Sequence, residues 1–419
     1  MRNVGRLEQT LFSATKVVGL IVRPLILLFF LRTDQDSLAQ DFSLLLTATA
    51  SSFIILNNQN YRVAYQLFLG SDRSSHGLRG RDVVRNYVVG TLVHILAFIG
   101  VASLVLWLWL DRGDLLVLAM ILILIEKFFD DDQRILVYKK RYYQWMINFT
   151  LRIIAPAIAL IIVSLATDID DVSLYVMSAT LGVAVYIYLI RRQFFRISYR
   201  LVKIEFKQGI SISIRRYFSE FRNEFFVAQV WAFLAANAIL IDRFFINISH
   251  ENIFADYIFA VSVANTIQTF HNLGYITFQR PRLLQADAIV ISSVFNRMNL
   301  LLPFVLFIII FTLYLLSIML EADLTPLSFE VILSLCGLYY MHAVSLPAKE
   351  MAFWRLRRNY LIAQECVLFT FPIVGYGLGF NSQLGIVLAT LCGLVVRLGL
   401  LITMLKLAET RQKRFNLRL

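Results

Sequence analysis

Long apolar segments separated by short polar connections run through nearly the whole chain. A helix needs about 20 apolar residues to cross the hydrocarbon core of a bilayer, and these segments reach that length. The pattern therefore predicts an all-α integral membrane protein. We expect twelve transmembrane helices, at residues 10–31, 41–69, 87–110, 115–138, 146–166, 172–190, 225–247, 252–278, 298–320, 328–348, 361–380 and 382–406.

The polar connections alternate in charge along the chain. One set, which includes Arg32–Ser37 and Asp111–Asp114, is acidic or neutral and has only Arg32 and Arg112 as cations. The other set includes both termini and most of the 40 Lys and Arg residues. Short loops rich in Lys and Arg stay in the cytoplasm. Both termini are therefore expected in the cytoplasm, and the net charge of +12 is assigned to loops that face anionic lipid, not to a nucleic-acid partner.

The two halves of the chain share one spacing. A constant shift of 215 residues moves the first six apolar segments onto the last six and places Phe29 and Phe30 on Phe244 and Phe245. Six spans per half is an even number, so the two repeats are parallel, as in one known class of transporters. The pattern predicts two parallel six-helix lobes around a central cavity.

The same pattern gives the expected domain boundaries. Residues 1–190 form the N-terminal lobe and residues 225–407 the C-terminal lobe. They are joined by a basic cytoplasmic linker, residues 191–224, which contains nine Lys and Arg residues, and a basic tail follows at residues 408–419. Part of the linker, residues 210–225, is either an amphipathic helix on the inner leaflet or a solvated connection.

An ionisable group inside a span is costly and marks a candidate functional site, and five of the cations within the predicted spans are candidates for a cationic interior. They are Lys16, Arg23, Arg62, Arg152 and Arg397. Lys16 and Arg23 are two helical turns apart and share a face of span 1. Because the planar guanidinium group donates paired hydrogen bonds to phosphate, we expect a cationic interior that receives an anionic group. The alternative for Lys16 and Arg62 is that their side chains extend to the cytoplasmic surface.

Other polar residues in the spans are candidates for coupling or gating. Asp131 belongs to the charged stretch Glu126–Arg134, which is either paired internally or a gate whose carboxylates bind a proton or Na⁺. Asp242 is followed by Arg243, and the two point about 100° apart on a helix, so we do not expect them to pair with each other. Among three isolated histidines, His271 is the candidate for coupling, while a hydrogen-bonded structural role is the alternative.

No cofactor, metal site or catalytic residue is predicted. The histidines lack the close ligand spacing of a metal site, and the three cysteines form no Cys-x-x-Cys pair. Phosphate-binding loops and hydrolase motifs are missing from the sequence, so we do not expect an enzyme. Glu365 falls near the inner interface, where we expect it to be solvated.

The chain resembles the polysaccharide and O-antigen flippases (the Wzx-like group) of the multidrug/oligosaccharidyl-lipid/polysaccharide exporter superfamily. The resemblance rests on the length, on two six-span halves, and most specifically on Ile239–Tyr257. This stretch is similar to the family's Ile-Asp-Arg-Phe element, short outer loop and aromatic residue that open the second half. The segment that ends at Phe42 resembles the matching element of the first half. Gln40-Asp41 and Ala255-Asp256 stand where the family commonly has a Gly before the aromatic residue, which leaves the subfamily open.

The resemblance implies a flippase that moves an undecaprenyl-diphosphate-linked oligosaccharide repeat unit across the bacterial inner (plasma) membrane by alternating access, for O-antigen (lipopolysaccharide), capsule or exopolysaccharide assembly. It implies that Arg23 and Arg62 hold the lipid diphosphate, with Lys16, Arg152 and Arg397 extending the cationic lining. A polysaccharide polymerase and a chain-length regulator are the protein partners that it suggests. Coupling to H⁺ or Na⁺ is left open.

Two other functions compete with the flippase. An antiporter of small cationic compounds with the same fold would need carboxylates deep in its cavity, whereas the deep charges here are mainly basic. A membrane-embedded polysaccharide polymerase or ligase belongs to a different class and typically carries a large outer loop, whereas the outer loops of this chain are short. A lipid II flippase is a closer competing function, but such proteins usually have two spans more than the twelve expected here.

Overall fold

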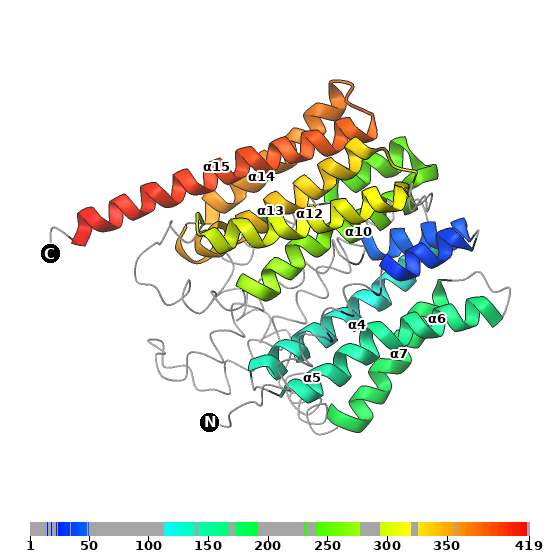
Figure 1. The fold of residues 1–419 in the computed structure, drawn as a ribbon. Helices are drawn as coiled ribbons and strands as arrows, with labels where there is room; N and C mark the ends of the chain where they lie inside the picture. The colour runs from blue at the N-terminus through cyan, green and yellow to red at the C-terminus, as the bar shows by residue number, and fades with distance from the viewer. Residues whose placement is uncertain are drawn as a thin grey trace. The chain divides into compact units, whose positions relative to one another are not determined.

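The structure is a computed structural model of the 419-residue chain. It describes residues 24–33, 35–47, 113–138, 141–166, 172–191, 240–276, 294–319, 326–356 and 358–416, with a few single residues between them. The described segments are helical and contain no strand (Figure 1). Six of the described helices are long and apolar enough to cross a membrane, so this is a multi-pass membrane protein. The count of twelve spans stays a prediction, because several expected spans lie outside the described residues.

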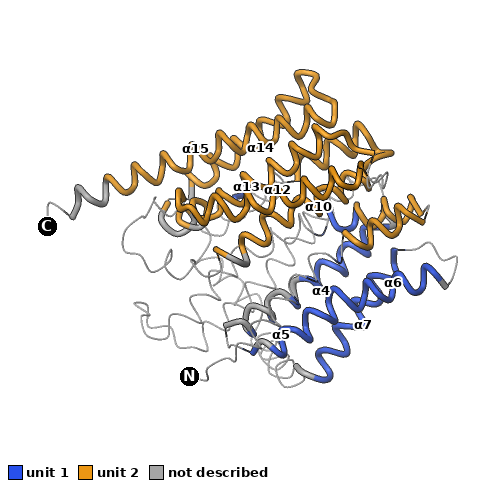
Figure 2. Tube along the Cα trace, in the orientation of Figure 1, with its two compact units in different colours: residues 1–22, 44–236 blue, residues 23–43, 237–419 orange. Residues whose placement is uncertain are grey.

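The chain divides into two compact units, drawn in two colours in Figure 2. Unit 1 contains residues 1–22 and 44–236, and unit 2 contains residues 23–43 and 237–419. The expected division into lobes at the linker 191–224 is close to the boundary at Ala236. One segment departs from it, since residues 23–43 cluster with unit 2.

Unit 1 is built on helix α4 (Gly113–Tyr138), which packs against α5 (Tyr142–Phe149) and α7 (Ser173–Tyr186). Helix α5 continues through a π-helical turn, η2 (Thr150–Ile154), into α6 (Ala155–Ala166), and α6 packs against α7.

The π-helical turn η2 has a local cause. Pro156 has no N–H group to bond the carbonyl of Arg152 four residues earlier, so the regular helical ladder is interrupted at this turn. A second π-helical turn, η3 (Ile187–Arg191), ends α7. Unit 1 therefore carries its one deep described cation, Arg152, in a turn of irregular backbone.

Unit 2 is centred on helix α13 (Phe329–Arg355), which packs against α10 (Phe254–His271), α12 (Arg297–Met319) and α15 (Gln383–Asn416). Helix α14 (Arg358–Gly377) packs mainly on α15. The short elements η4 (Glu251–Ile253) and η5 (Asn272–Ile276) flank α10. Helical residues 24–32, 36–43 and 240–249 also belong to this unit.

Burial differs between helices in the way expected for a bilayer. α12 has a mean hydropathy of 2.7, yet only Asn299, Pro303 and Ser317 of its residues are buried. α13 is less apolar, with a mean hydropathy of 1.5, and most of its span is buried in the protein. Because lipid tails solvate apolar side chains, an exposed apolar helix is stable in a membrane, whereas the polar side chains of α13 need partners inside the bundle.

The helix boundaries follow the repeat. Moving α4 forward by 215 residues gives 328–353, and α13 is observed at Phe329–Arg355. The same shift places the continuous helix α5–η2–α6 on 357–381, against α14 at Arg358–Gly377. It places α7 with η3 on 388–406, inside α15. The last three spans of the two halves are therefore equivalent elements in equivalent register.

We predict that Gly182→Ala destabilises unit 1 by about 1–3 kcal/mol, the usual cost of overpacking. A Cβ atom at Gly182 of α7 would lie 2.6 Å from the backbone carbonyl oxygen of Leu151 in η2, so the two helices must separate to admit it. Gly399→Ala is the matched control, because a Cβ there meets no atom within 4 Å. Unfolding by denaturant in detergent micelles measures both variants, and equal stability of the two would contradict the close helix contact.

Candidate functional site

The expected site residues are only partly within the described residues. Lys16, Arg23 and Arg62 lie outside them, and so does the side chain of Asp131, whose backbone belongs to α4. The structure therefore leaves the proposed diphosphate clamp as a prediction. The remaining four expected residues, Arg152, Arg397, Asp242 and His271, are described, and each has identifiable surroundings.

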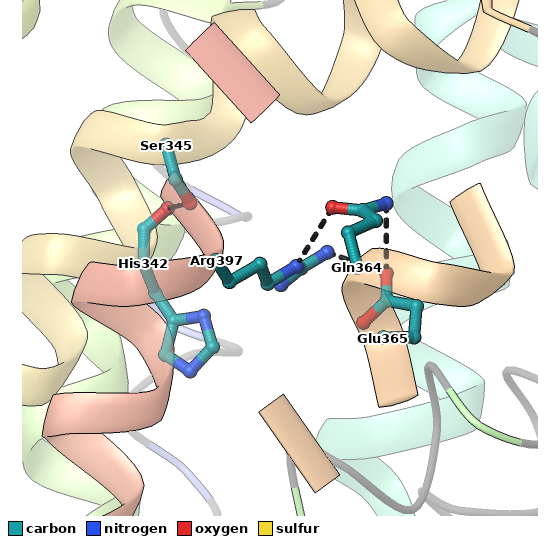
Figure 3. Close-up of polar contacts among 5 residues, drawn as sticks. All are labelled: His342, Ser345, Gln364, Glu365 and Arg397. Carbon is teal, nitrogen blue, oxygen red and sulfur yellow. Dashed lines mark hydrogen bonds and ion pairs between the residues drawn. The ribbon is translucent and has the colours of Figure 1, made fainter. Parts of the chain in front are cut away.

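Arg397 of α15 is fully buried and makes an ion pair with α14 (Figure 3). Its Nη2 donates to Oε1 of Glu365 at 2.5 Å, and its Nε donates to Oε1 of Gln364 at 3.1 Å. Gln364 and Glu365 are themselves fully buried. Glu365 thus neutralises the guanidinium group of Arg397, and Gln364, its neighbour on α14, helps to orient that group.

The carboxylate of Glu365 is only half satisfied. Its Oε1 receives Arg397 and, at 3.5 Å, the side-chain amide of Gln364. Its Oε2 is buried and has no hydrogen-bond partner. A buried carboxylate oxygen without a donor has lost its hydration without compensation, so this atom lowers the net stability that the ion pair contributes.

Helix α13 presents polar groups close to this pair. His342 is buried, and its backbone carbonyl accepts a hydrogen bond from the Ser345 hydroxyl at 2.8 Å (Figure 3). Three cations, Arg397, Lys349 and Arg243, are close enough for their charges to act on the His342 ring.

Arg152 of unit 1 is also paired, because its Nη2 donates to Oε2 of Glu126 on α4. Glu126 is buried. Further along α4, the buried Asp132 accepts hydrogen bonds from the Tyr186 hydroxyl of α7 and from Nδ2 of Asn148 on α5, the latter at 3.1 Å. Helix α4 therefore supplies two buried carboxylates, and each accepts hydrogen bonds from the helices packed against it.

Asp242 lies in the stretch that carries the family resemblance, on helix 240–249. It is buried, and its Oδ2 accepts a hydrogen bond from the Tyr257 hydroxyl of α10 at 2.6 Å. Arg243 instead donates to the Tyr339 hydroxyl of α13 at 3.1 Å. The two neighbours thus bind different helices, as their angular separation predicts. Phe245, two residues after Arg243, stacks on Tyr376 of α14 with ring centroids 4.3 Å apart.

His271 at the end of α10 joins three helices through Asn299. Its Nε2 lies 2.7 Å from Oδ1 of Asn299 on α12, and Nδ2 of Asn299 donates to the carbonyls of Val294 and Val344. Because Nδ2 is used as a donor twice, Oδ1 is the acceptor and His271 Nε2 carries the proton. His271 Nδ1 is buried without a partner. This geometry fits the structural alternative for His271 and leaves one free acceptor for a coupling role.

The sequence-based expectation for Glu365 is wrong, and Glu126 was missed as a deep carboxylate. Glu365 was expected to be solvated near the inner interface, yet it is fully buried. The physical reason is that α14 begins at Arg358, two turns earlier, so Glu365 is already within the packed helix pair. The signal available in the sequence was the presence of one deep cation on the following span, which required an anion nearby.

We predict that removing either partner of the Glu365–Arg397 pair is much more destabilising than removing both. Glu365→Gln and Arg397→Met should each lose about 3–5 kcal/mol, because an uncompensated charge remains buried. The double variant should lose less than either, since no charge is left. A double-mutant cycle measured by denaturant unfolding in micelles tests this, and additive losses would show that the two side chains do not interact.

No protein-family model matches the sequence, and no curated protein matches it. Among solved structures, the fold is similar to the inward-facing conformation of a multidrug resistance MATE family transporter of the MOP superfamily. The TM-score is 0.52, with 12% identical residues over 96% of each chain. The Vibrio cholerae MATE transporter VcmN in its bent form aligns over 96% of this chain and 95% of its own, with 14% identity and a TM-score of 0.34. The all-α membrane fold expected from the sequence is thus confirmed, and it is the fold of a MATE family transporter.

Proposed function

We propose that this protein is a flippase that moves an undecaprenyl-diphosphate-linked oligosaccharide from the inner to the outer leaflet of the bacterial inner membrane by alternating access. The transporter part of the proposal is supported by a transporter-like fold that spans nearly the whole chain. The choice of substrate is carried by one observation, the deep cations Lys16, Arg23 and Arg62 of the first two predicted spans.

These cations suit a lipid diphosphate for physical reasons. A diphosphate buried between helices needs fixed positive charge, and guanidinium groups bind phosphate with paired hydrogen bonds. Arg152 and Arg397 carry the same chemistry, but each is paired with a carboxylate in this structure. Arg23 and Arg62, assisted by Lys16, are therefore proposed to bind the diphosphate. Arg152 and Arg397 would bind the substrate only in a state in which their carboxylate partners are released.

The proposed function also implies a pathway, protein partners, an orientation in the membrane and an energy source. The product would be used in O-antigen, capsule or exopolysaccharide assembly, with a polysaccharide polymerase and a chain-length regulator as candidate partners. Both termini would be cytoplasmic, as the distribution of Lys and Arg favours. A proton or Na⁺ gradient would drive the cycle, with Asp131, Asp242 and His271 as candidate coupling or gating residues.

A drug or cation antiporter is the second candidate, and two observations favour it. The solved transporter with the similar fold is a multidrug resistance protein. The described residues also include four buried carboxylates, Glu126, Asp132, Asp242 and Glu365, which an antiporter of cations would need. Each of them already accepts a hydrogen bond from within its own unit, so they offer a cation less free charge than their number suggests.

We predict that Arg23→Ala and Arg62→Ala each abolish export, because a diphosphate without its cations cannot leave the headgroup region. Cells that lack the protein should accumulate undecaprenyl-linked repeat units on the cytoplasmic leaflet, and neither variant should restore surface polysaccharide. Membrane insertion, measured by the amount of protein in the membrane fraction, should be unchanged.

Arg32→Ala is the matched control, since Arg32 is an exposed cation at the outer end of the same span. It should restore export fully. Full export by the double variant Arg23→Ala/Arg62→Ala would remove the diphosphate clamp. Efflux of a fluorescent cation by wild-type vesicles, without any effect on lipid-linked oligosaccharide, would favour the antiporter instead.

A further inference from the structure

We propose that Arg243, together with Asn247 and Tyr339, forms a binding site for a phosphoryl group in unit 2. Arg243 and Asn247 lie on helix 240–249, within a predicted span, and Tyr339 lies on α13. The ligand would be the diphosphate of the lipid-linked oligosaccharide, so its identity rests on the proposed function. The anion site itself is argued from the contacts of unit 2.

Arg243 differs in its partner from the other arginines of the spans whose side chains are described. Arg152 and Arg397 each form an ion pair with a carboxylate. The guanidinium group of Arg243 instead donates to the neutral Tyr339 hydroxyl at 3.1 Å, its one hydrogen-bond partner among the described residues. A buried Nε without an acceptor does not set it apart, because Arg152 shares that feature. The difference is the missing carboxylate, and a guanidinium group within a span calls for an anion.

Asp242, the adjacent carboxylate in the sequence, does not take that place. Its Oδ2 accepts a hydrogen bond from the Tyr257 hydroxyl of α10 at 2.6 Å, and it forms no ion pair with a described residue. Its charge acts on Arg243 through space and lowers the cost of burying the cation. The N–H groups of Arg243 stay unblocked, whereas those of Arg397 are held directly by a carboxylate and an amide. An anion site needs unblocked donors of this kind.

The neighbours of Arg243 have further donors without acceptors. The Tyr339 hydroxyl accepts from Arg243, so its own proton is available, and no described residue receives it. Asn247 lies one turn after Arg243 on the same face of the helix. Its Oδ1 is buried without a partner, and its Nδ2 donates to no described residue. A group of donors that lack acceptors suits a phosphoryl group, whose oxygens accept several charge-assisted hydrogen bonds.

The internal repeat argues against a packing role for Arg243 and Tyr339. The shift of 215 residues places Arg243 on Leu28 and Tyr339 on Leu124. The first half therefore has apolar residues at both equivalent positions. Because an apolar residue avoids the desolvation cost of a buried arginine, helix packing gives no reason for a charge in the second half. A ligand that needs a positive charge does give one.

Arg243 is also accessible to a ligand. Its side chain is partly exposed, although Tyr339, which it contacts, is buried. Ionisable residues within spans face the bundle interior or a water-filled space and not lipid hydrocarbon. An anion can therefore approach the guanidinium group from inside the protein and leave the bond to Tyr339 in place.

Titration of the purified protein with farnesyl diphosphate tests the site. The protein is placed in nanodiscs of phosphatidylcholine, which has no net charge, and the affinity is measured by isothermal titration calorimetry. Arg243→Gln should weaken binding about ten- to hundredfold, because hydrogen bonds to a charged group are lost. Arg243→Lys keeps the charge without the planar fork and should fall between. Arg297→Gln is the matched control, because Arg297 is an exposed cation at the start of α12, and it should bind as the wild type does.

Asn247→Leu covers the case in which Arg243→Gln does not fold, because Asn247 makes no hydrogen bond to a described residue. It should weaken binding about three- to tenfold, with unchanged stability of the free protein. Wild-type affinity in Arg243→Gln or, where that variant does not fold, in Asn247→Leu would overturn the site. Equal weakening by Arg297→Gln would do the same, because it would indicate a general effect of charge.

Inorganic pyrophosphate separates a lipid-linked ligand from a free anion. It should bind more weakly than farnesyl diphosphate, and tighter binding would overturn the lipid-linked assignment. No binding of farnesyl diphosphate by the wild-type protein would overturn both this site and the diphosphate clamp. Normal export by Arg23→Ala/Arg62→Ala, with binding weakened by Arg243→Gln, would remove the clamp and support this site.

Discussion

A charged side chain inside a membrane protein must find its counter-ion within the helix bundle, because neither lipid nor bulk water supplies one. Two described cations, one in each unit, obey that constraint. Arg397 is neutralised by Glu365, and Arg152 is neutralised by Glu126. The helices that carry these partners are neighbours, so each ion pair also fixes the side chains of two packed helices relative to each other.

The same constraint decides which helices are buried. α13 carries His342, Ser345 and Tyr339 and is packed against several helices of unit 2, where these groups find hydrogen bonds or charged neighbours. α12 has few polar groups and exposes most of its residues. Its main buried polar side chain, Asn299, is fully used by His271 and two backbone carbonyls. Polarity and burial therefore rise together, which is the reverse of the relation in a water-soluble protein.

The two halves use one helical scaffold for different chemistry. The last three spans of each half share boundaries under a single shift, yet the crossing of the last two is a glycine contact in unit 1 and an ion pair in unit 2. Unit 1 places its ion pair one helix earlier, between α4 and η2. A duplicated scaffold permits this divergence, because close packing at glycine keeps the helices together whichever polar group is present.

The sequence by itself determined the membrane fold, the register of the repeat and the separate directions of Asp242 and Arg243. Each of these follows from local quantities: the length of an apolar run, the spacing of spans and the angle per residue of a helix. The partners of the deep charges were decided only by the tertiary structure. Glu365 and Arg397 are 32 residues apart in sequence, and whether their side chains meet depends on how α14 crosses α15. Hydropathy indicates how deep a residue lies in the membrane. It does not indicate which face of the next helix packs against that residue. Arg397, which the sequence places alone in its span, is therefore found paired with Glu365 in the structure.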